Sequence, residues 1–576
     1  MSIKSVLKSH FKPQDPLATI PPRFRQRNSA ADWSALLDAN RAEWNAARQA
    51  VQRGPRVLIP TSTGGHDAMT PLESLLAVAL TLRGARVHFF LCDQFLPACM
   101  LALSTDYDTQ EFVNGGLAAR ECPRCFGVGY STYQPLQLPI HTYSQFVSQK
   151  ERVRAAELAN SVPTEQIASY QLNGLAVGEH ALAGALRYFA IGELDNELLG
   201  EAVLRRYFEA SLLTAFATER LVSRYNFAAA VFHHGIYVPQ GIIGEVARRR
   251  QVRVVNWSMA YRKQCFIFSH NDSYHHTLRD EPTSAWDDMM WDETLEAEVM
   301  EYLNSRWLGT RDWISFHENP KLDTSNIAQE LGIDFAKPTI GLLTSVMWDA
   351  QLHYPTNAFP NMRVWLEETI KYFARRPDLQ LLIRIHPAEI TGTVPSRQRM
   401  MDVINAAFPQ LPPNVYVIPP ESPLSTYAAM LECDSVIIYG TKTGVELTSY
   451  GLPVVVGGEA WIRNKGLTLD ASTPQEYFTL LDHLPLGHKL EEDTLRRARM
   501  YAYHFFFRRM IPLQSLVPNP KWPPLRLNVE RLDDLRPGCD PGLDVICEGI
   551  LRGTPFIYPA EQLSRNELDY AIAQTA

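Results

Sequence analysis

The sequence predicts an α/β protein built from two doubly wound domains that face one another, with helical extensions at both ends of the chain. Two observations predict this fold class. Short apolar runs alternate with amphipathic helical stretches, a pattern typical of parallel sheets covered by helices on both faces. The alternation occurs in two separate series, and the 576 residues exceed the ~250 to 300 that a single hydrophobic core usually holds.

The composition excludes several other classes. Basic residues number 55 against 63 acidic ones, a net charge of −8, whereas a general nucleic-acid binder carries a basic excess. No apolar run reaches the ~18 residues that span a bilayer, and the first residues lack the apolar core of a signal peptide. Eight cysteines in so long a chain do not form a disulfide framework. We therefore expect a cytoplasmic protein whose partners are small molecules or neutral chains.

The first series of elements follows a polar extension. Residues 1–54 are Pro-punctuated and then helical at 31–52. Residues 55–310 form the first domain. We expect a strand at 57–60, a helix at 71–83 and a strand at 87–92, and the same order again within 228–257. Long helical segments are expected at 151–159 and 201–225.

The second series is more compact. After a linker at 311–337, residues 338–480 form the second domain, and residues 481–576 form a helical return segment with an irregular tail. The expected strands of the second domain are 339–344, 381–385, 415–418, 435–439 and 453–456, alternating mostly with helices at 362–376, 424–432 and 443–450.

The strongest local motif follows the strand at 435–439. Thr441, Lys442, Thr443, Gly444 and Glu446 open a helix there, and free backbone N–H groups at a helix start favour an anion. We expect a nucleotide diphosphate at this turn, with Lys442 adding charge and Glu446 accepting from a ribose or sugar hydroxyl. The alternative is an ordinary turn in which Thr441 or Thr443 caps the helix.

Two further segments lie at the same sheet edge. Arg384, His386 and Glu389 close another strand, where ligands of such folds bind, and His386 is expected to donate to a phosphate. Arg463 and Lys465 follow the last strand and carry two charges that clamp a diphosphate. The alternatives are a histidine that satisfies loop carbonyls and a solvated basic loop.

The first domain offers a base in its first strand-to-helix loop. Gly64 and Gly65 allow a ligand to approach the backbone, and His66 beside Asp67 forms an oriented general base. The alternative is a structural loop histidine.

We expect the acceptor substrate to bind at the next strand-end loop of the first domain. His233, His234 and Gln240 lie at the carboxyl edge of that strand. Glu245 is a rival base, or a helical glutamate on a solvated face.

Four of the eight cysteines are clustered in the sequence. Cys92 and Cys99 precede the C-x-x-C pair Cys122 and Cys125, and four thiolates at such spacing wrap a structural zinc ion. Free or buried thiols and an iron–sulfur or redox role are the alternatives.

Basic and aromatic residues interleave at 497–509. This pattern occurs in helices at a membrane interface and in helices that pack aromatic side chains between domains; we favour the second.

Four segments, at 346–353, 385–389, 420–427 and 439–446, resemble the bacterial capsule polysaccharide biosynthesis proteins, a GT-B-like group of surface-glycan glycosyltransferases. The likeness is best from about 339 to 470. It implies two Rossmann-like domains and transfer of a nucleotide-activated sugar to a surface glycan without a catalytic metal. It also implies that His386, Thr441, Thr443 and Glu446 bind the donor.

The expected activity is therefore glycosyl transfer, with no cofactor required for the transfer itself. His66 with Asp67, or Glu245, deprotonates the acceptor, a glycan or lipid-linked glycan of the capsule or lipopolysaccharide type. A lipid-linked acceptor would bring the protein into peripheral contact with the inner membrane. The rival hypotheses are a nucleotide-sugar epimerase or hydrolase and a non-catalytic assembly or export component.

Overall fold

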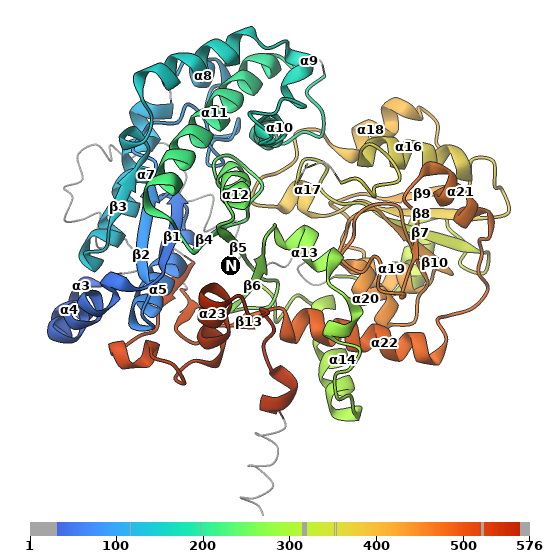
Figure 1. Cartoon of the computed structure of the whole chain (residues 1–576). Helices are drawn as coiled ribbons and strands as arrows, with labels where there is room; N and C mark the ends of the chain where they lie inside the picture. The colour runs from blue at the N-terminus through green and yellow to red at the C-terminus, as the bar shows by residue number, and fades with distance from the viewer. Residues whose placement is uncertain are drawn as a thin grey trace, which may run out of the picture.

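The computed structural model describes residues 32–564 except 116, 196, 314–319, 351, 353 and 520–523. The leader at 1–31, the centre of the expected linker and the tail from 565 lie outside the described residues. Two sheets lie side by side (Figure 1), the first drawn in blue and green and the second in yellow and orange. This arrangement confirms the predicted fold class.

The first sheet has the strand order β13-β6-β5-β4-β1-β2-β3. Strands β3, β2, β1, β4 and β5 run parallel, while β6 and β13 add antiparallel pairs at one edge. The bounds are β1 Arg56–Ser62, β2 Arg86–Leu91, β3 Ile140–Thr142, β4 Ala229–His233, β5 Arg253–Met259, β6 Cys265–His270 and β13 Ile511–Pro512.

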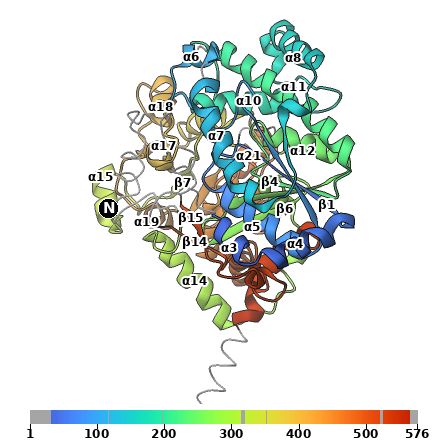
Figure 2. The ribbon, with the colours of Figure 1, turned by 90° about the vertical axis from the view of Figure 1, so that its left-hand side faces the viewer.

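Helices cover both faces of this sheet because alternate strand residues point to opposite sides. Val57 and Ile59 pack in one apolar cluster with α5 and α23, and Leu58 packs in another with α10, α11 and α12. Helices α3 and α4 lie at the opposite end of this half from α8 and α11 (Figure 2). The helices of this half are α3 Ser34–Ala39, α4 Arg41–Ala50, α5 Met69–Leu82, α6 Thr109–Val113, α7 Leu117–Tyr133, α8 Gln149–Ser161, α9 Thr164–Ile167, α10 Val177–Phe189, α11 Gly200–Tyr225, α12 Gln240–Arg249, α13 Tyr274–Asp280 and α14 Glu293–Trp307.

The second sheet is parallel throughout, in the order β12-β11-β10-β7-β8-β9. Its strands are β7 Thr339–Leu343, β8 Gln380–Arg384, β9 Val415–Ile418, β10 Ser435–Ile438, β11 Val454–Val456 and β12 Leu469–Asp470. Its helices are α15 Thr324–Leu331, α16 Met362–Phe373, α17 Ala388–Thr391, α18 Met400–Ala407, α19 Thr426–Leu431, α20 Thr443–Ser449 and α21 Pro474–Asp482.

The chain then returns from the second half to the first. Helix α22 Glu492–Tyr503 and the π-helical turn His504–Arg508 bury their aromatic side chains against α14 and α20, which confirms the packing interpretation of 497–509. The segment continues into β13, into the small hairpin of β14 Leu516–Pro518 and β15 Leu525–Leu527, and into α23 Pro541–Arg552. None of the helices that the structure describes is both long and apolar enough to cross a membrane.

Arg262 contacts both of the segments that connect the two halves. Arg262 forms a backbone bridge with Asp312 in the segment that leaves α14. Its guanidinium donates to the Phe506 carbonyl at 3.0 Å and lies 4.2 Å from the centre of the Phe507 ring, both in the returning segment. The outgoing and returning chains are therefore held together at one point.

Candidate functional site

Three histidines meet at the carboxyl edge of the first sheet. His66 lies in the loop after β1, His233 ends β4, and His234 follows with φ of 62°. The ring centres of His66 and His233 are 4.9 Å apart, and those of His233 and His234 are 5.5 Å apart. The neighbouring strand ends of a parallel sheet bring these loops together, as the sequence predicted.

Two members of this cluster were missed by the sequence analysis. His275 on α13 lies with its ring centre 6.0 Å from that of His234. Arg187 on α10 is near enough for its charge to lower the pKa of His66, His233 and His234. Both helices lie outside the strand-end loops that the prediction relied on, so no local motif marked them.

Burial keeps the histidine cluster uncharged. It lowers the pKa of His66 to about 4, with further lowering by Arg187 and His234, and it lowers the pKa values of His233 and His275 well below the ordinary value. The Nδ1 atoms of His233 and His234 are buried without a hydrogen-bond partner among the described residues. Neutral imidazoles with unpaired nitrogens are suited to accept a proton from a bound hydroxyl.

The tautomer of His66 is not fixed by its own loop. Its Nδ1 accepts from the Ala68 N–H at 3.4 Å, which is longer than an ordinary N–H hydrogen bond. Asp67 is half-buried in the same loop. The Ala68 N–H is therefore only a weak restraint on the ring of His66.

The second half contacts the first beside these histidines. The Tyr237 hydroxyl donates to Asp349 Oδ1 at 2.9 Å and accepts from the Ala350 N–H at 3.0 Å. Burial lowers the pKa of His234 to about 4, although the charge of Asp349 opposes this shift. The cluster thus lies at the boundary between the halves.

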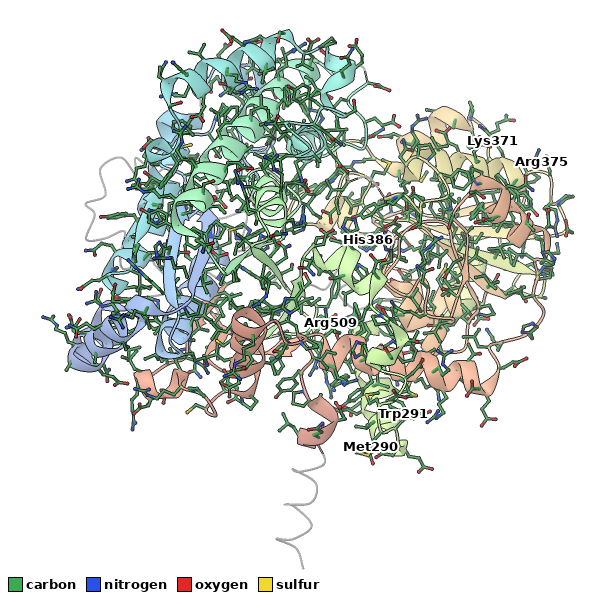
Figure 3. The ribbon with its side chains drawn as sticks, viewed as in Figure 1. Met290, Trp291, Lys371, Arg375, His386 and Arg509 are labelled. Carbon is green, nitrogen blue, oxygen red and sulfur yellow. The ribbon has the colours of Figure 1, made fainter. Side chains whose placement is uncertain are left out.

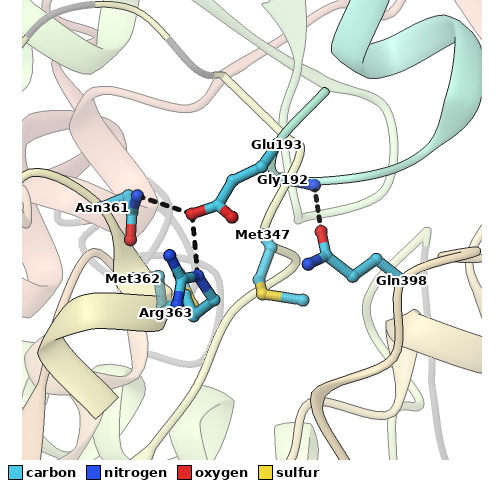
Figure 4. Close-up of a pocket in the computed structure, with 7 residues that line it drawn as sticks. All are labelled: Gly192, Glu193, Met347, Asn361, Met362, Arg363 and Gln398. Atoms are coloured by element: carbon cyan, nitrogen blue, oxygen red, sulfur yellow. Dashed lines mark hydrogen bonds and ion pairs between the residues drawn. The ribbon is translucent and has the colours of Figure 1, made fainter. Parts of the chain in front are cut away.

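A small hollow marks another contact between the halves (Figure 4). The Glu193 carboxylate accepts from Asn361 Nδ2 at 3.0 Å and from Arg363 Nε at 2.8 Å. The Gly192 N–H donates to Gln398 Oε1 at 2.8 Å. These contacts tie the loop after α10 to the second half.

His386 lies at the end of β8, between the two halves (Figure 3). Its Nδ1 accepts from the Ala388 N–H at 3.0 Å, and its own N–H donates to Thr344 Oγ1 at 3.1 Å. Because Nδ1 is an acceptor, the neutral ring carries its proton on Nε2. That tautomer is a hydrogen-bond donor, the form required to contact a phosphate oxygen.

The turn before α20 contains local capping contacts. Thr443 N–H donates to Thr441 Oγ1 at 3.3 Å, and the two hydroxyls are 3.2 Å apart. A Cβ on Gly444 would lie 2.6 Å from the Ile438 side chain, so this glycine serves the packing of α20 on β10. Gly440 is exposed and faces open space.

The remaining cations proposed for the diphosphate have internal partners. Arg384 donates to the carbonyls of Pro419 and Ser422, and Arg463 to those of Gly458 and Ala471. Lys465 donates to the carbonyls of Arg279 and Glu281. These three side chains are 1–2% exposed, and we leave them out of the donor site. Glu389 is likewise buried and accepts from the Met400 N–H.

Glu446 is enclosed in an ion-pair network. Its carboxylate lies 3.1 Å from Arg306 Nε and 3.0 Å from Lys442 Nζ, and it accepts from the Tyr427 hydroxyl. Burial raises the pKa of this carboxyl, but Arg306 and Lys442 outweigh burial and lower it to about 2. Because the carboxyl is fully buried, it links α14 to α20 and is not open to a ribose hydroxyl. We therefore correct its assignment to a structural one.

The other first-half assignments also change. Burial raises the pKa of Glu245, but His180 and Arg248 outweigh it and lower the pKa to about 2, which suits an ion pair and not a base. Gln240 donates to the Thr61 carbonyl at 3.0 Å. Gly64 is contacted by the backbone of Gly129 on α7, where a ligand was expected.

A buried carboxyl lies behind the histidine cluster. Glu73 on α5 accepts from Thr61 Oγ1 at 2.5 Å and from Trp257 Nε1 at 3.0 Å, and the backbone of His233 also contacts it. Burial raises the pKa of Glu73 to about 8. The carboxyl is therefore protonated in the folded protein at neutral pH.

Glu73→Gln is expected to flatten the dependence of stability on pH. Between about pH 4.5 and about 8 the folded protein holds a proton that the unfolded chain releases. Stability therefore falls as pH rises, by up to ~1.4 kcal/mol per pH unit. Urea unfolding at pH 5, 6.5 and 8 measures this slope. The exposed Glu157→Gln is the control, and an unchanged slope in Glu73→Gln would contradict the assignment.

The four clustered cysteines line a single cavity. Cys92 follows β2, Cys99 lies in the next loop, and Cys122 and Cys125 are on α7. Burial raises the pKa of Cys92 and Cys122 to about 12 and that of Cys99 and Cys125 as well. Uncharged thiols are poor nucleophiles. In the part of the chain that the structure describes, no three metal-binding side chains are grouped around one ion.

The chain was compared with known proteins. No family model and no curated protein matches it. Among solved structures, KpsC of Thermosulfurimonas dismutans, a beta Kdo 2,4 transferase, has 12% identity and a TM-score of 0.32 over 54% of this chain and 88% of that one. The spinosyn rhamnosyltransferase SpnG has 11% identity and a TM-score of 0.23 over 78% and 95%.

The UDP-GlcNAc 2-epimerase of Neisseria meningitidis, with UDP-GlcNAc bound, has 12% identity and a TM-score of 0.25 over 77% and 98%. Likenesses at this level carry no argument about activity. The two facing parallel-rich sheets themselves define a GT-B-like α/β protein.

Proposed function

We propose that the protein is a glycosyltransferase that moves a sugar from a nucleotide-activated donor to a surface-glycan acceptor. One observation carries the proposal. Neutral, buried histidines from separate loops of the first half gather where the second half meets it. A site at the carboxyl edges of two α/β halves suits a reaction between two substrates, one held by each half.

Each of these residues has a separate role in the proposed transfer reaction. His66 accepts the proton of the acceptor hydroxyl, and negative charge on a bound diphosphate would raise its pKa toward neutrality. Arg187 compensates that charge. His386 donates from Nε2 to the departing phosphate, and Thr441 and Thr443 contribute hydroxyls beside it. Preorganised donors aimed at developing charge are usually the largest catalytic contribution.

The transfer as proposed needs no cofactor, because imidazoles and hydroxyls cover both proton transfer and charge stabilisation. The acceptor is a glycan or lipid-linked glycan of the capsule or lipopolysaccharide type, elongated on the cytoplasmic side of the inner membrane.

A binding screen followed by product analysis tests the proposal. A nucleotide sugar is expected to raise the melting temperature, since ligand at 100 times Kd stabilises the folded state by ~2.7 kcal/mol. With that donor and a glycan acceptor, we expect free nucleotide and an elongated glycan. Release of nucleotide with a rearranged or free sugar in the absence of acceptor would overturn the transferase and support an epimerase or hydrolase. No turnover with any donor and acceptor would support a non-catalytic role.

A further inference from the structure

Four thiols from two segments converge on one cavity in the first half. Cys92 follows β2, Cys99 lies further along the same loop, and Cys122 and Cys125 lie on α7. The spacing of three residues between Cys122 and Cys125 puts both thiols on one face of the helix. All four cysteines are free, without a disulfide.

The cavity has room for a group larger than a single ion. The space between its lining residues, open solvent included, is about 490 Å³. Apart from the thiols, its walls are mostly apolar, and they include Leu96, Leu101, Ala102 and Tyr107. Ser62, Thr63 and Glu121 also line the cavity, so its walls offer one carboxylate beside the four thiols.

Backbone donors point at the sulfurs. The Gly65 N–H donates to Cys125 Sγ at 3.1 Å. The backbone of Phe95 and Leu96 acts against the burial that raises the pKa of Cys92, and the backbone of Leu101 and Ala102 does the same for Cys99. A neutral thiol is a weak acceptor. Such N–H groups instead stabilise negatively charged sulfur, as they do around iron–sulfur clusters.

The arrangement does not suit zinc. Zn–S bonds of ~2.3 Å bring four sulfurs within ~3.8 Å of one another, and within the described ranges no three metal-binding side chains are grouped in that way. A cluster of several irons bridged by sulfide spreads its cysteine ligands over more than one metal atom, so they need not meet at one ion. Four thiols that line one cavity without three of them meeting at one ion fit this second case.

We propose that Cys92, Cys99, Cys122 and Cys125 ligate an iron–sulfur cluster. On binding, each thiol releases one proton and its sulfur bonds to iron. The iron and the sulfide come from the cellular assembly machinery or from a reconstitution mixture. The proposal replaces the expected structural zinc and does not depend on the glycosyltransferase assignment.

The cluster site is also connected to the loop that follows β1. The hydrogen bond from Gly65 to Cys125 joins the cavity to the loop that carries His66. Loss of the cluster is therefore expected to lower the melting temperature as well as the metal content.

Anaerobic purification of the full chain tests the proposal. We expect two to four irons with an equal amount of acid-labile sulfide per chain, broad visible absorption and a Mössbauer spectrum of sulfur-ligated iron. Cys92→Ser and Cys125→Ser are expected to lose iron and sulfide, whereas Cys539→Ser, at an exposed cysteine, is expected to retain both.

The unsubstituted chain decides the question even if a variant fails to fold. One equivalent of zinc without sulfide, or no metal after reconstitution with iron and sulfide, would overturn the proposal. Full iron and sulfide content in soluble Cys125→Ser would also overturn it.

Discussion

His66→Ala is expected to lower kcat by roughly 100- to 10,000-fold, the range that a general base contributes, with a much smaller change in KM for the donor. The imidazole is buried with its pKa lowered to about 4, and its neighbour His233 is also neutral. The substitution removes the imidazole that accepts the proton of the acceptor hydroxyl in the proposed reaction. Initial rates at saturating donor and acceptor measure the effect.

Three controls make this result specific to proton transfer. His483→Ala removes an exposed histidine of the second half and should leave kcat unchanged. Added imidazole should restore part of the activity of His66→Ala, since the substitution leaves a space beside His233. Unchanged melting temperature shows that the loop is intact. A fall in donor affinity with kcat preserved would remove His66 from the chemistry.

Arg306→Met is expected to lower the free energy of unfolding by about 3 to 5 kcal/mol, the cost of breaking a buried ion pair from one side. Arg306 is buried between Glu446 and Asp312. Its loss leaves the enclosed Glu446 carboxylate with Lys442 and Tyr427 alone. Chemical denaturation at neutral pH measures the difference.

A double variant and a substitution in an exposed ion pair are the controls for that prediction. Arg306→Met with Glu446→Gln should recover part of the loss, because only Asp312 then remains as a buried carboxylate that has lost Arg306. Arg311→Met breaks the ion pair with Glu301, whose side chains are 50% and 67% exposed, and should cost at most ~1 kcal/mol. Equal effects of Arg306→Met and Arg311→Met would contradict the network.

The ion pairs of Glu446 also affect how the stability of the unsubstituted chain depends on pH. The folded pKa of Glu446 is lowered to about 2. The contribution of Glu446 to the free energy of unfolding is therefore fully present above the ordinary carboxyl pKa. It is lost as the pH falls toward about 2.

The sequence predicted the parallel strands well because buried strands carry continuous apolar runs. β1, β2, β4 and β5 and the main strands of the second sheet lie where such runs were found. β6 was missed because Cys265–His270 follows a turn instead of a helix, and β13 because two residues at the far end of the chain give no periodic signal.

The candidate site was predictable only where it lies on strand-end loops. His66, His233 and His386 follow strands, so their edge positions came from the pattern. The partners of Lys465 and Glu446 come from α13 and α14 or the loop between them, far away in sequence. A charge near a sheet edge is therefore not evidence of a ligand until its internal partners are known.

Arg262 has a mechanical consequence for substrate entry. The outgoing segment pairs with the backbone of Arg262 and the returning segment is bound by its side chain, so both connections between the halves meet at one residue. Separation of the two halves is then expected to be a rotation about that residue, which breaks the contacts of Tyr237 with Asp349 and of Glu193 with Arg363. Each turnover that admits a long acceptor would have to release those contacts while Arg262 stays in place.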